Sequence, residues 1–309
     1  MIYTITLNPT IDRTMHFPRL AVGELNRAVS SRTDLSGKGV NVTIALSRLG
    51  LESVMLGFSA GAYGRVLEQG LVDMGYTCDF VEVPGETRSN VTVIDDATGI
   101  TTKLNEAGPQ IDEAGIRAFE NRLEQKLKSG DLCVFSGSLP PGAPVGTYAR
   151  LIRLCHKQGA ITALDTSGPA MAIGCQANPG LVKPNGIEAA EMVSMPFETP
   201  DQWLNGVQAI RRLGPERVFL SLGSRGAVYA DDTTTYWCQP PKIQEVSAIG
   251  AGDSAMAGTL WAWLQQKPTQ EIARWGVAFG TAAAMQDGTA IPQRTQVYAV
   301  YEQTTVTAL

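Results

Sequence analysis

A glycine-rich turn that ends in an acid, Gly250-Ala251-Gly252-Asp253, precedes an apolar run near the C-terminal end of the chain. Small residues let backbone N–H groups point at an anion, and the helix that follows adds partial positive charge at its first turn. Such an anion hole beside a carboxylate suits phosphoryl transfer, in which the amides hold the phosphate and Asp253 takes the acceptor hydroxyl's proton. The helix terminus is expected to keep Asp253 ionised, and therefore a weak base. An aspartate that only caps a helix has the same local pattern.

A second glycine-rich turn, Gly37-Lys38-Gly39 with Asn41 after it, also precedes a segment of helical periodicity. Its spacing is not that of a Walker loop, and no G-x-G-x-x-G follows the first predicted strand. The glycines permit close backbone approach, Lys38 adds a cation, and Asn41 adds a directed donor and acceptor. These groups would suit a polar or phosphorylated small substrate, whereas the alternative is a tight turn with a solvent-exposed lysine.

Side chains near the first predicted strand and a predicted hairpin could bind a sugar and its phosphate. Asn8 and Asp12 follow that strand, and ligands of parallel α/β sheets collect beyond the carboxyl ends of strands. A turn-forming role is the alternative for Asp12. Arg88 and Asn90 are two residues apart and so share one face of a strand. Arginine is suited to bidentate phosphate binding, although an exposed hairpin arginine is ordinary.

Two segments in the second half could face a nucleotide. Lys183 and Asn185 lie at the end of a predicted strand, and Asn185 with Glu188 matches a capping box. The same pair could organise Mg²⁺ and its waters beside nucleotide phosphates, so both roles stay open. A glycine-bounded turn after Ser221 could line phosphates or ribose, or form a plain hairpin.

Strand-like and helix-like segments alternate through most of the 309 residues, which predicts βα units and a largely parallel sheet. The predicted strands are 3–7, 54–58, 132–136, 161–165, 181–183 and 217–222. The predicted helices are 39–49, 63–74, 115–128, 145–158, 201–213, 255–265 and 271–285, the last two of which are expected to close the chain.

Segments 17–32 and 87–103 break this rhythm, and the second predicts a β-hairpin around the turn that ends in Thr98-Gly99. Together they predict a small sheet outside the main one, which could close over the site as a lid or serve only in dimerisation. We therefore expect a single domain, 1–309, with lid segments near 13–35 and 85–105.

Composition limits the classes of function. A hydrophobic content of 44% and a charged content of 18% describe a folded globular protein, and a net charge of −5 argues against a general nucleic-acid or membrane-surface binder. No run approaches the ~18 apolar residues of a membrane span, and no signal peptide is predicted. Five scattered cysteines and two histidines make a zinc site improbable and favour a reduced, cytoplasmic protein.

Taken together, these motifs resemble the ribokinase-like carbohydrate kinases, specifically the phosphofructokinase-B branch, over essentially the whole chain. The nine segments that carry the resemblance, in order, are Thr6-Leu7-Asn8-Pro9 with Asp12, Gly37–Val42, Thr87–Asn90, Asn105–Pro109, Ser136–Pro140, Asp165–Gly168, Lys183–Asn185 with Glu188, Ser221–Gly223 and Gly250–Ser254. One departure is Ala248-Ile249 before Gly250, where the family usually has Thr-Val.

The resemblance implies an α/β sandwich of three layers with a small β-sheet lid, and a kinase that uses ATP and Mg²⁺. It implies that Asp253 is the base and that Gly250, Ala251 and Gly252 form the anion hole. The residues implied to bind the sugar phosphate are Asp12, Gly37, Lys38, Gly39, Asn41, Arg88, Asn90 and Ser138. Those implied to face the nucleotide are Lys183, Asn185, Ser221, Gly223 and Gly226, while Glu188 supports the metal through water.

Lys38, Arg88 and Asn90 look like the branch that phosphorylates sugars already carrying a phosphate, so the resemblance implies a ketohexose phosphate as substrate. Fructose 1-phosphate, converted to fructose 1,6-bisphosphate, is the expected substrate, with tagatose 6-phosphate and fructose 6-phosphate as alternatives. A homodimer formed through the lid is expected. Three further functions compete with this one: a nucleoside or ribose kinase, a non-catalytic sugar-binding regulator, and an NAD-linked oxidoreductase, which the absent dinucleotide fingerprint disfavours.

Overall fold

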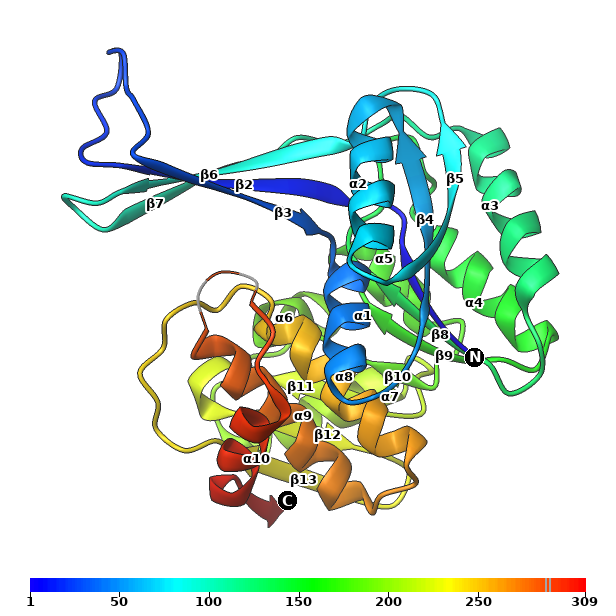
Figure 1. Cartoon of the computed structure of the whole chain (residues 1–309). Helices are drawn as coiled ribbons and strands as arrows, with labels where there is room; N and C mark the ends of the chain where they lie inside the picture. The colour runs from blue at the N-terminus through cyan, green and yellow to red at the C-terminus, as the bar shows by residue number, and fades with distance from the viewer. Residues whose placement is uncertain (287, 289) are drawn as a thin grey trace.

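The computed structural model describes residues 1–286, 288 and 290–309, and its large central sheet lies between two layers of helices (Figure 1). The sheet has the order β14-β13-β12-β11-β10-β9-β8-β1-β4-β5. Neighbours from β11 to β5 in this order run parallel, while β12, β13 and β14 extend one edge in antiparallel fashion. The strands are β1 Ile2–Thr6, β4 Val54–Ala60, β5 Thr77–Val83, β8 Leu132–Ser136, β9 Ile161–Asp165, β10 Leu181–Val182, β11 Val218–Ser221, β12 Ala227–Ala230, β13 Thr235–Gln239 and β14 Thr305–Ala308. The predicted three-layer α/β fold is confirmed.

Helices cover both faces of the sheet. Residues of α3 to α7 join the hydrophobic cluster on one face, and residues of α1, α8, α9 and α10 join the cluster on the other, where α2 packs beside α1. The helices are α1 Lys38–Arg48, α2 Gly61–Asp73, α3 Glu113–Lys126, α4 Thr147–Lys157, α5 Pro169–Cys175, α6 Gly186–Val193, α7 Pro200–Arg211, α8 Ala251–Leu264, α9 Thr269–Ala284 and α10 Arg294–Gln303, with the short 3₁₀ helix η1 Gly223–Arg225.

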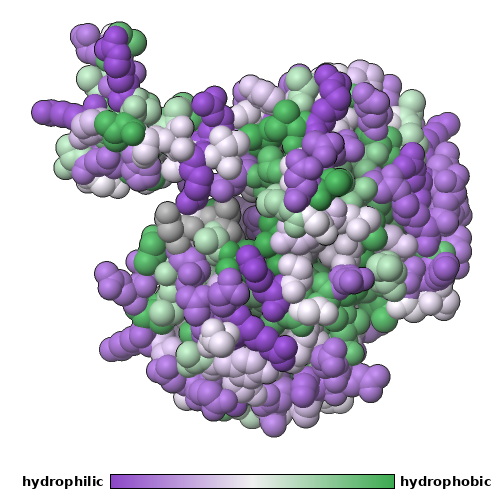
Figure 2. Space-filling view, viewed as in Figure 1, coloured by the Kyte–Doolittle hydropathy of each residue, from purple (hydrophilic) through white to green (hydrophobic). Residues whose placement is uncertain are grey.

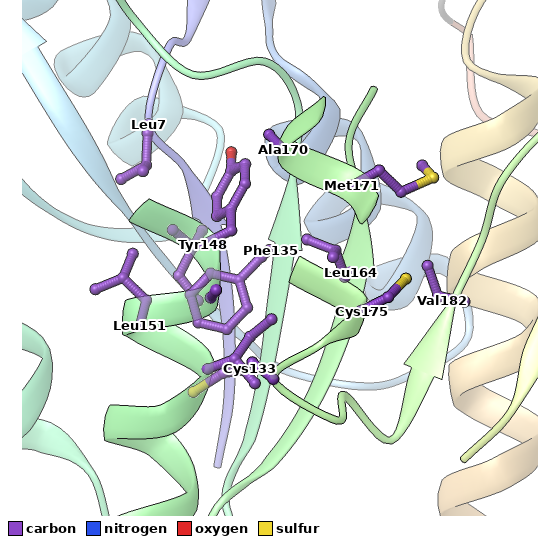
Figure 3. Packing of buried hydrophobic residues seen from close by; sticks show 14 of the residues in the cluster. Leu7, Cys133, Phe135, Tyr148, Leu151, Leu164, Ala170, Met171, Cys175 and Val182 are labelled. Carbon is purple, nitrogen blue, oxygen red and sulfur yellow. The ribbon is translucent and has the colours of Figure 1, made fainter. Parts of the chain in front are cut away.

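The parallel strands are buried on both faces, which explains their nearly continuous apolar sequences. Along β11, for example, Phe219 packs on one face while its two neighbours pack on the other. Figure 3 shows Phe135 of β8 beside Tyr148 of α4, with ring centroids 5.8 Å apart. The Tyr148 hydroxyl donates to the carbonyl of Gly137, 2.9 Å away, so the core also fixes the turn that follows β8.

A separate four-stranded sheet, which we call the lid, has the order β3-β2-β6-β7. Its strands are β2 Thr10–Phe17, β3 Ser30–Ser36, β6 Arg88–Asp95 and β7 Ile100–Leu104. The predicted hairpin is confirmed. The first lid segment, however, begins at residue 10 rather than near 13, so the turn-forming alternative for Asp12 is wrong: the residue pairs with Asn90 across β2 and β6. Figure 2 shows the lid standing apart from the body above a hollowed face.

The prediction that two helices close the chain is wrong, because α10 and β14 follow them. Strand β14 is short and mostly exposed, and its pairing with β13, such as Thr307 opposite Trp237, defines it. Elements β5, α5 and β13 were likewise not predicted. None of the helices in the described residues is long and apolar enough to cross a membrane.

Candidate active site

The structure confirms a helix start at the acidic glycine turn. Gly250 adopts a left-handed conformation with φ +76° and is the N-cap of α8, and Asp253 lies in the first turn. The amide of Asn41 in α1 donates to Asp253 Oδ2 over 2.8 Å, joining segments 212 residues apart. Burial raises the pKa of the Asp253 carboxyl to about 6, against the opposing charge of Lys38. Asp253 is therefore still ionised at pH 7, as expected, but it is a stronger base than expected, because burial raises its pKa.

Beside Asp253, a fully buried Asp165 at the end of β9 lies between two lysines. Lys38 Nζ is 3.0 Å from Asp165 Oδ1, and Lys183 Nζ is 3.2 Å from Oδ2. Burial alone would raise the pKa of Asp165, but the charges of Lys183 and Lys38 hold it below its ordinary value. The charge of Asp165 in turn raises the pKa of Lys38, so Lys38 is held beside the carboxylate as a cation.

The predicted anion hole, residues 250–252, lies next to this ion-pair group. A Cβ at Gly252 would come within 3.3 Å of Lys183 Nζ, so the ammonium group lies against the first turn of α8. Within the described residues, the amides of Gly252 and Asp253 donate to no backbone carbonyl outside the helix. Free amides and an ammonium group therefore face the same small region, which suits an anion.

The turn at residues 37–39 brings α1 close to the sheet. Gly37 has φ +139°, which disfavours any side chain, and a Cβ at Gly39 would overlap the hydroxyl of Thr6 in β1. These glycines let the first turn of α1 deliver Lys38 and Asn41 to Asp165 and Asp253 respectively. Of these two predicted substrate residues, Asn41 thus contacts the predicted base, and Lys38 contacts the neighbouring Asp165.

The other predicted sugar-phosphate residues lie where the lid joins the body. Asn90 donates to Asp12 over 3.0 Å, and Arg88 Nη2 donates to the carbonyl of Asn8 over 2.9 Å. Arg88 and Ser138 line a cleft of about 500 Å³. Burial lowers the pKa of Arg88, with the charge of Asp12 acting in the opposite direction. Asp12 and Asn90 do not line the cleft.

The residues predicted to face a nucleotide follow β10 and lie at the end of β11 and in the turn to β12. Asn185 and Glu188 form the complete capping box of α6, in which Glu188 Oε2 accepts from the Asn185 amide over 2.8 Å. Asn185 also bridges to Ser221 at the end of β11. Gly223 and Gly226 both have positive φ in the turn to β12, and a Cβ at 226 would overlap the Cys238 carbonyl.

Sequence reasoning assigned no role to Asp165, although it stands in one of the motifs, and it noted Asn8 only for its position after the first strand. The available signal for Asp165 was its position as the last residue of a predicted buried strand, before the polar turn Thr166-Ser167-Gly168. In the part of the chain that the structure describes, no cluster of three or more His, Cys, Asp or Glu could hold a metal ion by itself.

Comparisons with known proteins agree with this geometry. A family model described as pfkB family carbohydrate kinase matches residues 5–296. A 1-phosphofructokinase of Bacillus subtilis is 35% identical over 287 residues, covering 93% of each chain. A tagatose-6-phosphate kinase of Staphylococcus epidermidis is 30% identical over 292 residues, covering 94% of each. The solved phosphofructokinase-2 of Escherichia coli in complex with fructose-6-phosphate has a TM-score of 0.90 at 30% identity, covering 97% of this chain and 98% of that one. This chain therefore belongs to the pfkB family of carbohydrate kinases.

Proposed function

We propose that the protein transfers the γ-phosphoryl group of ATP to a hydroxyl of a ketohexose phosphate, converting fructose 1-phosphate to fructose 1,6-bisphosphate. The observation that carries the proposal is the buried Asp253 carboxylate in the first turn of α8, within electrostatic reach of the Lys38 and Lys183 ammonium groups. A base and cations converging at the carboxyl edge of a parallel sheet are what phosphoryl transfer to an alcohol requires.

In this mechanism the acceptor hydroxyl oxygen attacks the γ-phosphorus, and the bond to the β–γ bridging oxygen breaks to release ADP. Asp253 takes the hydroxyl proton. A pKa of about 6 leaves this carboxyl ionised at pH 7 and makes it a stronger base than an exposed aspartate. The amides of Gly252 and Asp253, with the two lysines, offset the negative charge of the phosphates.

Mg²⁺ fits this chain as a companion of the nucleotide rather than as an ion in a protein cage. Glu188 uses Oε2 for the capping box, and Oε1 has no hydrogen-bond partner in the described part of the chain. A single carboxylate, with waters and substrate phosphates, is a common set of Mg²⁺ ligands. We propose that Glu188 holds Mg²⁺ through water, and that the bound ion neutralises phosphate charge.

Glu188→Gln separates the capping and metal roles. Glutamine also serves at the third position of a capping box, so α6 should keep its start, whereas the negative charge is lost. We expect the Mg²⁺ concentration for half-maximal activity to rise several-fold, measured by titrating Mg²⁺ at fixed ATP. Gln202→Glu, at the same position of the α7 capping box, is the matched control and should leave the titration unchanged. An unaltered titration in Glu188→Gln would restrict the residue to capping.

The sugar is assigned from the cleft and from the relatives together. Arg88 and Ser138 in the cleft suit a phosphate already present on the substrate. Relatives named 1-phosphofructokinase, such as that of Bacillus subtilis at 35% identity, support fructose 1-phosphate, with its 6-hydroxyl as the acceptor. ATP consumption should be measured side by side with fructose 1-phosphate, fructose 6-phosphate, tagatose 6-phosphate and the free sugars. A higher kcat/KM for another phosphate would reject the sugar assignment, and no turnover with any of them would reject the kinase.

Arg88→Ala tests the phosphate contact. Loss of a charge-assisted pair costs about 1.5–3 kcal/mol, so we expect the KM for the sugar phosphate to rise roughly ten- to a hundred-fold while the KM for ATP changes little. Arg13→Ala removes an exposed cation from the neighbouring lid strand and is the matched control. Equal effects of Arg88→Ala on both KM values would mean that Arg88 serves the nucleotide or the fold.

We further propose that two copies pair through the lid. The lid and its loop expose large apolar side chains away from the cleft: Val22 is 96% exposed, Leu25 77% and Ile100 62%. Burial between two lids would remove these apolar side chains from water. Pairing remains a prediction for this chain.

A further inference from the structure

The contacts of one residue, Asn8, link the body to both lid segments that border the cleft. Asn8 is 4% exposed and lies between β1 of the central sheet and β2 of the lid. Its side-chain Nδ2 donates to the carbonyl of Ala107 over 3.0 Å, and its own carbonyl accepts from Arg88 Nη2 over 2.9 Å. The two partners belong to β6 and to the segment after β7, so a single asparagine holds both relative to the end of β1.

The segment after β7 is also tied to β6 directly. Glu106 Oε2 accepts from the Ser89 amide over 2.8 Å, and the Glu106 amide donates to Asn90 Oδ1 over 3.3 Å. Gly108 has φ +95°, and a Cβ there would overlap Asn8 Oδ1. The contacts therefore form a closed ring that runs from Asn8 through residues 106–108 to β6 and back through Arg88.

Two residues of this ring, and Thr166 in the lining of the same cleft, have unpaired polar atoms. Asn8 Oδ1, Arg88 Nε and Thr166 Oγ1 are buried and have no hydrogen-bond partner in the described residues, and all three residues line the cleft of about 500 Å³. An unmade hydrogen bond of a buried group costs free energy, so native structures keep such groups mainly where they have a role. Asn8 thus engages one nitrogen of Arg88 and leaves Nε of the same guanidinium unpaired.

The chemistry of an amide also matters at this position. A carboxamide can hold the Ala107 carbonyl and pack against Gly108 without adding charge. An aspartate would place a carboxylate beside the guanidinium and would neutralise part of the attraction that Arg88 exerts on an anion. The neutral side chain therefore holds Ala107, while the backbone carbonyl of the same residue holds Arg88 and leaves the charge of the guanidinium available.

We propose that Asn8 is a positioning residue for the sugar phosphate: it holds Arg88 and residues 105–109 in the arrangement that receives the phosphate of the substrate. This inference rests on the proposed function, in which that phosphate enters the cleft. Asn8 itself need not touch the substrate, because its contacts act through Arg88 and Ala107.

The test is Asn8→Ala, which keeps the carbonyl that accepts from Arg88 and removes only the tie to Ala107. We expect the KM for the sugar phosphate to rise about tenfold, with kcat changed less than threefold and the KM for ATP less than twofold. Asn26→Ala is the matched control, since Asn26 also binds backbone groups, those of Ala21 and Glu24, in the outer loop of the lid.

A double-mutant cycle with Arg88→Ala distinguishes positioning from a structural role. If Asn8 acts through Arg88, adding Asn8→Ala to Arg88→Ala leaves the KM for the sugar phosphate almost unchanged, whereas independent effects multiply. The inference would be overturned if the two substitutions raised the KM for the sugar phosphate by independent factors that multiply, or if Asn8→Ala alone left this KM unchanged.

Hydrogen exchange of the substrate-free protein supplies a readout that needs no turnover. Asn8→Ala should speed exchange at the Ser89 and Glu106 amides at least fivefold and leave β8 unaffected. An inactive wild-type protein would refute the proposed function, and the exchange rates would still show whether Asn8 holds the segment around Ala107. An active wild type with unchanged exchange and KM in the variant would refute the role of Asn8 alone.

Discussion

Asp253→Asn should fold normally and lose about 10²–10⁴-fold in kcat, since this is the typical contribution of a positioned general base. The asparagine can still accept from Asn41 and occupy the first turn of α8, so the change removes the base with little change of shape. Steady-state assays at saturating ATP and sugar phosphate measure the loss. Asp112→Asn, at the N-cap of α3, removes another carboxylate from a helix start and should keep full activity.

The pH dependence follows from the raised pKa of Asp253. In the wild type, kcat should be constant above pH 7 and fall about tenfold per pH unit well below pH 6, because the base becomes protonated.

A carboxyl whose pKa is raised by folding stabilises the protein at low pH, and this contribution is lost as pH rises through about 6. Asp253→Asn should therefore unfold no more readily than the wild type at pH 8. Turnover close to that of the wild type would remove Asp253 from the mechanism.

Asp165→Asn should lower both stability and activity. The carboxylate is fully buried between Lys38 and Lys183, and removing one partner of a buried ion pair typically costs 3–5 kcal/mol. Because the Lys38 side chain is 40% exposed, water screens part of this loss, and we expect about 3 kcal/mol in the free energy of unfolding. Urea denaturation at pH 7 measures it. We expect kcat to fall at least tenfold, since both lysines lose the group that positions them.

The sign of the pH effect gives a second check on Asp165. Its pKa lies below the ordinary value in the folded protein, so its contribution is present above pH 4 and is lost as pH falls further. The difference in the free energy of unfolding between the wild type and Asp165→Asn should therefore become smaller as the pH falls below 4. Asp131→Asn is the matched control, because Asp131 is also a buried aspartate, paired with the N-terminal ammonium group over 2.8 Å. It should reduce stability without changing kcat, and similar losses of activity in both variants would contradict a specific role for Asp165.

Much of the local structure could be predicted from the sequence, because its causes lie within a few residues. The glycine turn before Asp253 begins a helix, Asn185 and Glu188 form a capping box, and segment 87–103 forms a hairpin. Alternation of strand and helix signals likewise predicted the parallel sheet and its helical layers. Edge elements such as β14 were not predicted, because they are defined by pairing with another strand and not by their own composition.

The arrangement of the site depended on tertiary structure. Nothing local places Lys38 on Asp165, which is 127 residues away, or Asn41 on Asp253, and these two contacts were not predicted. The strength of Asp253 as a base was underestimated because the helix terminus is a local feature, whereas burial, which raises the pKa of Asp253, depends on the whole fold. The sequence by itself thus determined which residues could do chemistry and which elements carry them. Only the packing of distant segments decided which charges share a buried space, because desolvation and Coulomb interactions depend on distance in space rather than along the chain.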